Sequence, residues 1–529
     1  MSDGVVADSQ DATLSTYKRN KVNPVQETTQ EAHLLDFKDI DGSAQKEEAT
    51  PLNNSVQEVQ KSPGKLRQIC AFPPQGIVAE IITNVMAAAL IWAVVWSVMG
   101  QDSLPRGSVF GILFLFFCSV LGGKLMELIK IPGLPPLPRL LGMLLAGFLI
   151  RNVPFTNTLV QINVKWAAAL RNIALSIILA LAGLGIDPKA LNTLKAVCFR
   201  LSLGPCIIEA CSAAVLSHFI MHLPWEWGFM LGFVLGAVSP AIVVLSMLML
   251  QSKGYGVDKG IPTLLIAAGS LDDVVAITGF NTFLGMAFST GSPLRSLLRG
   301  LIEVAVGAGA GGLLGVFIWY FPSKDQTYLV WKRAFFVLGL SVSTLLGSKY
   351  VGLPGSGGLC TIVLAFLGGL RWSDEKRAVE EIVAIAWQIF QPFLFGLIGA
   401  EISVVSLGPK MVGFCLATMG SALLVRVTAT FLLVTASGFD FKEKVFIALA
   451  WIPKATVQAA IGSIALDTAR ELQNHELEQY GLTILTIAFL AILFTAPTGA
   501  LIIGLAGPCL LHKTDKSSEE DGRGTVSPI

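Results

Sequence analysis

Long apolar runs alternate with short polar stretches along most of this chain, and the pattern predicts a bundle of membrane-spanning helices. A helix needs about 20 mostly apolar residues to cross the hydrocarbon core of a bilayer. By that measure the chain between Gly76 and Leu511 holds about fourteen spans, and the fold class is an all-α polytopic membrane protein. The predicted spans are residues 76–100, 107–129, 136–151, 164–186, 194–221, 225–250, 261–288, 297–321, 333–350, 355–371, 380–404, 408–437, 445–468 and 481–511.

Both ends of the chain are polar. Residues 1–70 lack the basic start and apolar core of a secretory signal, and their composition is typical of a disordered tail. A second polar tail covers residues 512–529. Lys and Arg are more frequent in the loops that share a side with the N-terminus, so the positive-inside rule places both tails in the cytoplasm.

Three short motifs recur in the same order in the two halves of the chain. GLPPLPRLLGMLLAGFLIRN resembles GLPGSGGLCTIVLAFLGGLRW, LAGLGID resembles LIGAEIS, and VSPAIV resembles IPKATV. Six spans and one linker span separate the copies, so the second copy would lie upside down in the membrane, as in an inverted-topology repeat. The transmembrane domain is then residues 76–511, with repeat 1 at 107–288, a linker helix at 297–321 and repeat 2 at 333–511.

Composition narrows the class of function. The chain is 53% hydrophobic and 14% charged, with a mean hydropathy of +0.66, which a soluble domain of 529 residues would not show. A net charge of +1 without a basic run gives no reason to expect a nucleic-acid partner. The eight cysteines form no CxxC pair, and no Walker-type nucleotide motif is present, so we expect no cofactor.

Two proline-containing breaks interrupt apolar spans at corresponding places in the halves. Ser239-Pro240 and Pro453-Lys454 leave backbone groups without helical partners at membrane depth, which predicts two discontinuous helices that cross near the midplane. The Lys454 ammonium can offset the negative end of a half-helix, and Glu401 is the expected acidic partner or charge compensation. Thr456 adds a polar atom close by, although it can simply bond to its own backbone.

Glu209 and Arg426 lie in spans that the repeat makes equivalent. Each costs about 2.5 to 3.5 kcal/mol to insert alone into a membrane. An ion pair between them would offset this cost. We expect the pair to have a structural role and to lie near the functional site.

The stretch LDDVV carries two adjacent carboxylates, Asp272 and Asp273, near the middle of the span 261–288. Neighbouring positions differ by about 100° around a helix, so the pair can share a cavity without making the same contacts. Burial and mutual repulsion both favour protonation, and the two groups titrate as a coupled unit. Because no histidine lies deep in a span, oxygen ligands for Na⁺ or Li⁺ are favoured over a transition-metal site. A carboxylate that binds either a cation or a proton, but not both, can couple the movement of one ion to that of the other, as an antiporter requires. Asp273 is the expected direct ligand of the cation.

These motifs resemble a known family. GSLDDVVAI, the broken SPA and PKATVQAA segments and the membrane Arg426 are similar to the two-aspartate branch of the cation/proton antiporter superfamily. The polar N-terminal tail, the extra first span and an Arg in place of a Lys resemble the animal sodium/hydrogen exchanger 9B subfamily.

The resemblance implies a homodimer with a panel-like dimerisation domain and a six-helix core that moves against it. It also implies Na⁺, Li⁺ and H⁺ as substrates, membrane lipid as surroundings, and a plasma, endosomal, lysosomal or mitochondrial membrane as location. Electrogenic relatives carry a Lys where this chain has Arg426. Because arginine stays protonated, the substitution favours electroneutral exchange by alternating access.

Other functions fit parts of the pattern. A K⁺/H⁺ antiporter or an electrogenic Na⁺/H⁺ antiporter would have the same fold. An intramembrane aspartyl protease also needs two membrane carboxylates, but such proteases place them on different helices.

Overall fold

The computed structural model is helical throughout the part of the chain that it describes, which is residues 76–129, 136–186, 195–288, 293–372, 375–404 and 408–513. The tail predicted over residues 1–70 and nearly all of the second tail lie outside these residues. Eleven helical segments within the described ranges are long and apolar enough to cross a membrane, and one of them, Trp225–Ser252, is interrupted before Pro240. The predicted number of about fourteen spans is therefore not confirmed, because several of the predicted spans fold as shorter helices.

The elements before the linker helix follow the predicted order. They are α2 (Ile77–Met99), η1 (Gly100–Ser103), α3 (Ser108–Leu128), α4 (Arg139–Asn152), α5 (Pro154–Leu159), α6 (Val164–Gly185), α8 (Lys195–Met221), α9 (Trp225–Gly236), α10 (Pro240–Ser252) and α11 (Ile261–Ala287). The linker is α12 (Pro293–Tyr320).

The second half runs in a compatible order. Its elements are α13 (Leu329–Tyr350), α14 (Ser356–Leu370), α15 (Lys376–Glu401), α16 (Pro409–Val434), α17 (Phe441–Ala450), α18 (Thr456–Gly462), α19 (Ile464–Glu471) and α20 (His475–Leu510). The short helices α9, α10, α17 and α18 arise because the sequence contains Pro240 and Pro453, which cannot donate a backbone hydrogen bond.

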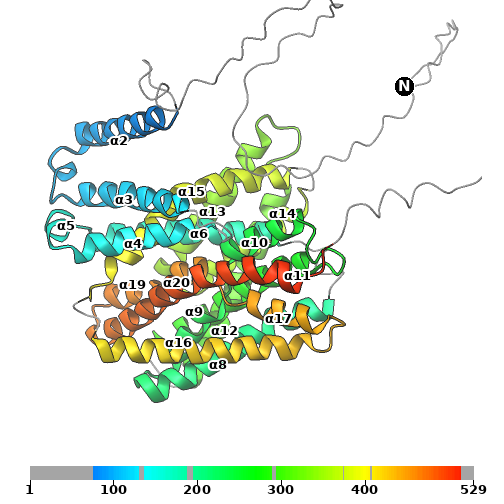
Figure 1. The fold of residues 1–529 in the computed structure, drawn as a ribbon. Coiled ribbons are helices and arrows are strands. Elements are labelled where there is room, and N and C mark those ends of the chain that lie inside the picture. Colours follow the sequence, from blue (N-terminus) through cyan, green and yellow to red (C-terminus); the bar gives the residue numbers. More distant parts are fainter. Residues whose placement is uncertain are drawn as a thin grey trace, which may run out of the picture. The chain divides into compact units, whose positions relative to one another are not determined.

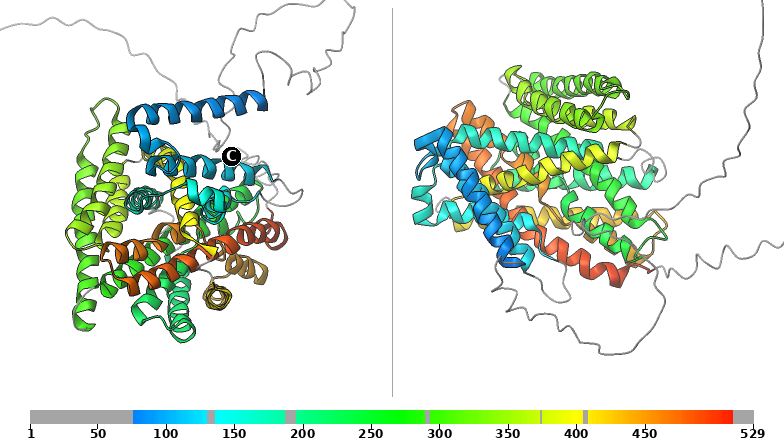
Figure 2. Two further views of the ribbon diagram at one scale, coloured as in Figure 1. Left: turned by 90° about the vertical axis from the view of Figure 1, so that its left-hand side faces the viewer. Right: turned by 90° about the horizontal axis from the view of Figure 1, so that it is seen from above.

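The helices form two sets that pack mainly among themselves (Figure 1). The panel set contains α3, α4, α6, α13, α14 and α15, whereas the core set contains α8 to α11 and α16 to α20. α12 packs on both α14 and α11 and so joins the sets. α2 lies apart from most of the bundle and contacts η1 and α3, as the left view of Figure 2 shows.

Candidate functional site

The two aspartates lie in the middle of α11 and are both buried. Asp272 and Asp273 are 0% and 1% exposed. The Asp272 Oδ2 atom accepts hydrogen bonds from the backbone N–H of Val238 and from Nη2 of Arg426, each at 2.9 Å. The Asp273 Oδ1 atom has no hydrogen-bond partner. Adjacent helix positions point in different directions, so the protein holds Asp272 through its Oδ2 atom, while Asp273 Oδ1 stays available.

The two broken helices meet beside α11. The first break separates α9 from α10 and the second separates α17 from α18. The Ser239 N–H donates to the carbonyl oxygen of Pro453 at 2.8 Å, so the breaks are bonded directly to each other. A Cβ atom on Gly499 of α20 would lie 2.5 Å from Pro453, and this close approach requires glycine.

Side chains from other elements bind every free carbonyl at the C-terminal end of α9. The last four carbonyls of a helix have no partner within it. Gln458 donates from Nε2 to Val234 and Ala237, at 3.0 and 2.8 Å. Lys454 Nζ donates to the carbonyl of Leu235, and Arg426 Nη1 donates to that of Gly236. Two cations and an amide thereby satisfy the negative end of this half-helix.

Glu209 joins the two cations. Its Oε2 atom lies 2.6 Å from Arg426 Nη1 and 2.8 Å from Lys454 Nζ, and all three side chains are 0% exposed. The expected Glu209–Arg426 pair is therefore present. The expectation that Glu401 pairs with Lys454 is wrong, because Lys454 reaches Glu209 across the break while Glu401 lies at the end of α15. The central cluster consists of Glu209, Asp272, Asp273, Arg426 and Lys454.

Glu401 belongs to a second group of charges, named here the seam cluster: Arg171, Glu401, Asp467 and Arg470. Arg470 binds both Glu401 oxygens at 3.0 Å, and Arg171 binds Asp467 through Nε and Nη2. Arg171 and Asp467 are 1% and 4% exposed. Arg171 lies on α6 and Glu401 on α15 of the panel set, whereas Asp467 and Arg470 lie on α19 of the core set. These pairs therefore bridge the two sets.

Sequence reasoning missed the seam cluster and the role of Gln458. Arg171 and Asp467 each lie in an apolar span, so the insertion cost that drew attention to Glu209 could have identified them too. Gln458 stands out in the sequence as a polar side chain beside the break, but nothing local reveals its partners, because they are backbone carbonyls 224 and 221 residues away.

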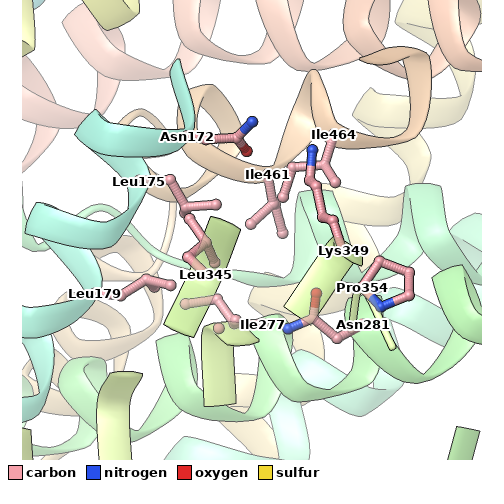
Figure 3. A pocket seen from close by; sticks show the side chains of 11 residues that line it. Asn172, Leu175, Leu179, Ile277, Asn281, Leu345, Lys349, Pro354, Ile461 and Ile464 are labelled. Atoms are coloured by element: carbon pink, nitrogen blue, oxygen red, sulfur yellow. The ribbon is translucent and has the colours of Figure 1, made fainter. Parts of the chain in front are cut away.

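A small cavity lies on the same side of α11 as Asp273. Its volume of about 10 Å³ is close to the minimum for one water molecule. Ile277 and Asn281, one and two turns beyond Asp273, line it from the core set (Figure 3). Asn172 and Lys349 line it from the panel set, so the cavity lies at the seam between the sets.

Several buried oxygens near the breaks have no hydrogen-bond partner. They are Asp272 Oδ1, Asp273 Oδ1, Ser239 Oγ, Thr456 Oγ1 and Gln458 Oε1. Carboxylate, hydroxyl and amide oxygens are the ligands that hard cations prefer. The elements that meet at the breaks thus carry oxygen atoms suited to Na⁺ or Li⁺.

Comparison with known proteins gives strong matches over nearly the full chain. The family described as sodium/hydrogen exchanger, transmembrane, matches residues 112–504. The chain is 57% identical to sodium/hydrogen exchanger 9B2 of Homo sapiens over 527 residues, which is 98% of this chain and 97% of that one. It is 61% identical to sodium/hydrogen exchanger 9B2 of Xenopus tropicalis, covering 94% of each chain. Sodium/hydrogen exchanger 9B1 of Homo sapiens is 54% identical, covering 90% of this chain and 92% of that one.

The fold matches a solved structure. The sodium proton antiporter MjNhaP1 from Methanocaldococcus jannaschii superposes with a TM-score of 0.60 and 20% sequence identity. The match covers 76% of this chain and 98% of the antiporter chain. The predicted antiporter-type fold is therefore confirmed.

Proposed function

Because the chain belongs to the sodium/hydrogen exchanger family, a family of multi-pass membrane transporters, we propose that it exchanges one Na⁺ or Li⁺ for one H⁺. Asp273 binds either the cation or the proton. Asp272 is the accessory carboxylate, held in place by Arg426 and by the backbone of the first break. Sodium/hydrogen exchangers are not enzymes, so the aspartyl protease alternative is set aside.

The charge of the central cluster carries this proposal. Three carboxylates, from Glu209, Asp272 and Asp273, face two cations, from Arg426 and Lys454, which leaves one negative charge when all five groups are ionised (−3 + 2 = −1). A buried net charge is costly, so one bound Na⁺, Li⁺ or H⁺ makes the cluster neutral. Because either ion gives the same neutral state, the site can cross the membrane loaded with one or the other.

Arg426 supports exchange without net charge movement. A carrier that moves a second proton needs a basic group that loses its own proton during the cycle. Arginine remains protonated in proteins, and here it also has two carboxylate partners. Arg426 therefore cannot carry a second proton, which supports a stoichiometry of one cation for one proton.

The test is cation-driven proton flux in proteoliposomes that contain the full-length protein. We expect Na⁺ and Li⁺ to dissipate an imposed pH gradient, and Asp273→Asn to abolish the response. Asp272→Asn should leave a weakened response, since Asp272 is accessory. Unchanged flux in the double variant would overturn the site assignment.

Clamping the membrane voltage with K⁺ and valinomycin tests the stoichiometry. An electroneutral exchanger gives the same rate with and without the clamp, whereas a faster rate under the clamp indicates an electrogenic antiporter. A response to K⁺ that equals the response to Na⁺ would favour the K⁺/H⁺ alternative.

The same proposal includes a homodimer with both termini in the cytoplasm, resident in the plasma membrane or in an endosomal, lysosomal or mitochondrial membrane. The excess of Lys and Arg on the N-terminal side supports the orientation. Native mass spectrometry of the detergent-solubilised protein tests the oligomer, since the chain mass is 56.3 kDa.

A further inference from the structure

One buried acid belongs to neither cluster. Glu303 lies on α12, and its side chain is 1% exposed. Its Oε2 atom accepts a hydrogen bond at 2.7 Å from the backbone N–H of Gly355, which directly precedes α14 of the panel set. On the core side, a Cβ atom on Gly285 of α11 would lie 3.0 Å from the Glu303 Oε1 atom. The carboxylate is therefore enclosed where the linker helix, the core set and the panel set meet.

The linker helix α12 is packed tightly on the panel set. Glycines recur at every fourth position on its α14 side, and such small residues let two helix backbones approach closely. A Cβ atom on Gly307 would lie 2.6 Å from the carbonyl oxygen of Ser356, and one on Gly311 would lie 2.6 Å from that of Cys360. We therefore expect Glu303 to stay with α14 when the sets move, while α11 slides past it.

This acid lies at the same end of the bundle as the seam cluster. One turn before it, Arg299 Nη2 donates a hydrogen bond to the carbonyl oxygen of Gly352 at 2.7 Å. Lys349, three residues before Gly352, pairs with Glu471 of α19 at 3.6 Å. This end of the bundle is named here the seam end. Alternating access exposes the ion site at each end in turn, so the two sets must separate at the seam end during part of the cycle.

Glu303 also borders the cavity that lies on the same side of α11 as Asp273. Asn281 of α11 and Pro354 both line that cavity (Figure 3), and Gly355 follows Pro354. A Cβ atom on Gly355 would lie 2.5 Å from Glu303 Oε2 and 2.7 Å from the carbonyl oxygen of Asn281. The acid thus lies directly behind the cavity wall, so separation of α11 from α14 brings water to the cavity and to the acid together.

Few charges act on this carboxylate. Among the residues that the structure describes, Arg299 is the charged side chain that faces it, with the Nε atom 3.4 Å from Glu303 Oε1. The Arg299 side chain is 38% exposed, so water screens its charge. From α11 and α14 the acid meets backbone atoms at Gly285 and Gly355, and on α13 the cation Lys349 is paired across the seam. A carboxylate with so little compensation favours its neutral form when covered and its charged form when water reaches it.

We propose that Glu303 is a second proton-binding carboxylate of the exchanger, protonated while α11 covers it and ionised once the seam end opens. The proton passes between a Glu303 oxygen and water at the seam end. It returns to the side from which it came, so one cation still exchanges for one proton. Acid at the seam end therefore favours the closed arrangement and slows exchange, in addition to competing with the cation at Asp273. This role rests on the proposed exchange.

The experiment measures exchange by the full-length protein in proteoliposomes of one orientation. The pH is varied on the seam-end side and held constant on the other side. Glu303→Gln should remove one proton from the dependence of the rate on this pH, so the rate changes up to about tenfold less per pH unit. Glu303→Asp still titrates and should keep the original slope. A lower rate with an unchanged slope in Glu303→Gln would show a purely structural role and would overturn the proposal.

Glu380→Gln is the matched control. Glu380 also pairs with a cation one turn away on its own helix, Lys376 at 3.7 Å. It lies near the start of α15, whereas Glu401 of the seam cluster is the last residue of that helix. Its removal should leave the slope unchanged on the seam-end side. Equal losses of slope in Glu380→Gln and Glu303→Gln would also overturn the proposal.

A second variant tests the same group from its partner. Arg299→Gln removes the cation that stabilises the charged form of Glu303. The pH at which the rate is half-maximal on the seam-end side should therefore move upward. An unmoved midpoint would contradict the proposal, even where Glu303→Gln fails to fold.

Infrared spectroscopy of the purified protein tests the proton without any exchange. A protonated-carboxyl band should titrate with pH in the unchanged protein and should be missing from Glu303→Gln. Absence of ion exchange by the unchanged protein would be a failure of the proposed function. The same titrating band in both proteins would instead be a failure of the role assigned to Glu303.

Discussion

The central cluster and the seam cluster are both groups of buried charges, but they join different parts of the molecule. Glu209, Asp272, Asp273, Arg426 and Lys454 all lie on helices of the core set or at its break. The seam cluster instead joins Arg171 and Glu401 of the panel set to Asp467 and Arg470 of the core set. Lys349 of the panel set also pairs with Glu471 at 3.6 Å, so α19 carries three residues that bind charged side chains of the panel set.

The difference assigns the clusters different tasks in alternating access. Charges within one set can stay paired while the sets move, so the central cluster can carry its ion without breaking. Charges between the sets must separate before the sets can slide past each other. We therefore expect the central cluster to persist through the cycle and the seam cluster to open, exposing the cavity beside Asn172 and Asn281.

The largest expected effect comes from linking the two sets covalently. In a cysteine-free background, Glu401→Cys/Arg470→Cys joined by a short bifunctional thiol reagent should abolish exchange, and cleaving the linker should restore it. Since Glu401 and Arg470 are 18% and 24% exposed, reagents can reach them. Flux is measured in proteoliposomes before linking, after linking and after cleavage.

The matched control also uses position 470 but links it to a residue of the same set. Arg470 also pairs with Glu478 at 3.0 Å, and both residues lie in the core set. Linking Arg470→Cys/Glu478→Cys should leave exchange intact. Continued exchange with positions 401 and 470 linked would refute the opening of the seam.

The next largest effect is on stability. Arg426→Gln removes the partner of two buried carboxylates, and breaking a buried pair costs on the order of 3 to 5 kcal/mol. We expect a large drop in the temperature at which the detergent-solubilised protein unfolds. Arg426→Lys keeps the charge and should lose less. Equal losses in both variants would mean that packing, and not charge, makes Arg426 important.

A smaller effect is expected from Gln458→Leu, which keeps the approximate volume but removes the donor to two carbonyls. Each unsatisfied buried carbonyl costs about 1 to 3 kcal/mol. The thermal stability should fall by less than in Arg426→Gln. Gln458→Glu offers no amide donor and should be no better, so full stability in that variant would contradict the proposed role.

The smallest effect is expected where Lys259 pairs with Asp440, since their side chains are 37% and 60% exposed. Lys259 Nζ lies 2.8 Å from both Asp440 Oδ2 and Glu443 Oε2. Lys259 lowers the pKa of Asp440, mainly through their hydrogen bond. A carboxyl whose pKa is lowered on folding contributes stability above its unfolded pKa and loses it as the pH falls through its folded pKa.

Lys259→Ala should therefore lower the unfolding temperature slightly at neutral pH and not at all below the pKa of Asp440. Thermal melts of the unchanged protein and of Lys259→Ala, each at neutral pH and at a pH below the pKa of Asp440, measure this difference. A loss at neutral pH as large as that of Arg426→Gln would contradict the ranking by burial.

The sequence predicted those parts of the site that are costly to place in lipid and that can be recognised from the residues around them. Two adjacent carboxylates, two broken helices and a lone Glu209 and Arg426 each stand out in an apolar span, since inserting a charge or an unpaired backbone into lipid is costly wherever it occurs. The Glu209–Arg426 pair followed from the repeat and is present at 2.6 Å. The prediction failed for Glu401, because an acid at a helix end looks the same whether its partner is Lys454 or Arg470.

The sequence by itself thus determined the helical spans, the breaks and the presence of costly charges. Apart from the Glu209–Arg426 pair, only the tertiary structure decided which charges meet, since the partners lie far apart in the chain: 245 residues for Lys454 and Glu209, and 296 for Arg171 and Asp467. Hydropathy fixes the depth of a residue in the membrane, because each span crosses it independently. The direction in which a side chain points is fixed by how the helices pack against one another, and that is why one cluster lies within a set and the other between two.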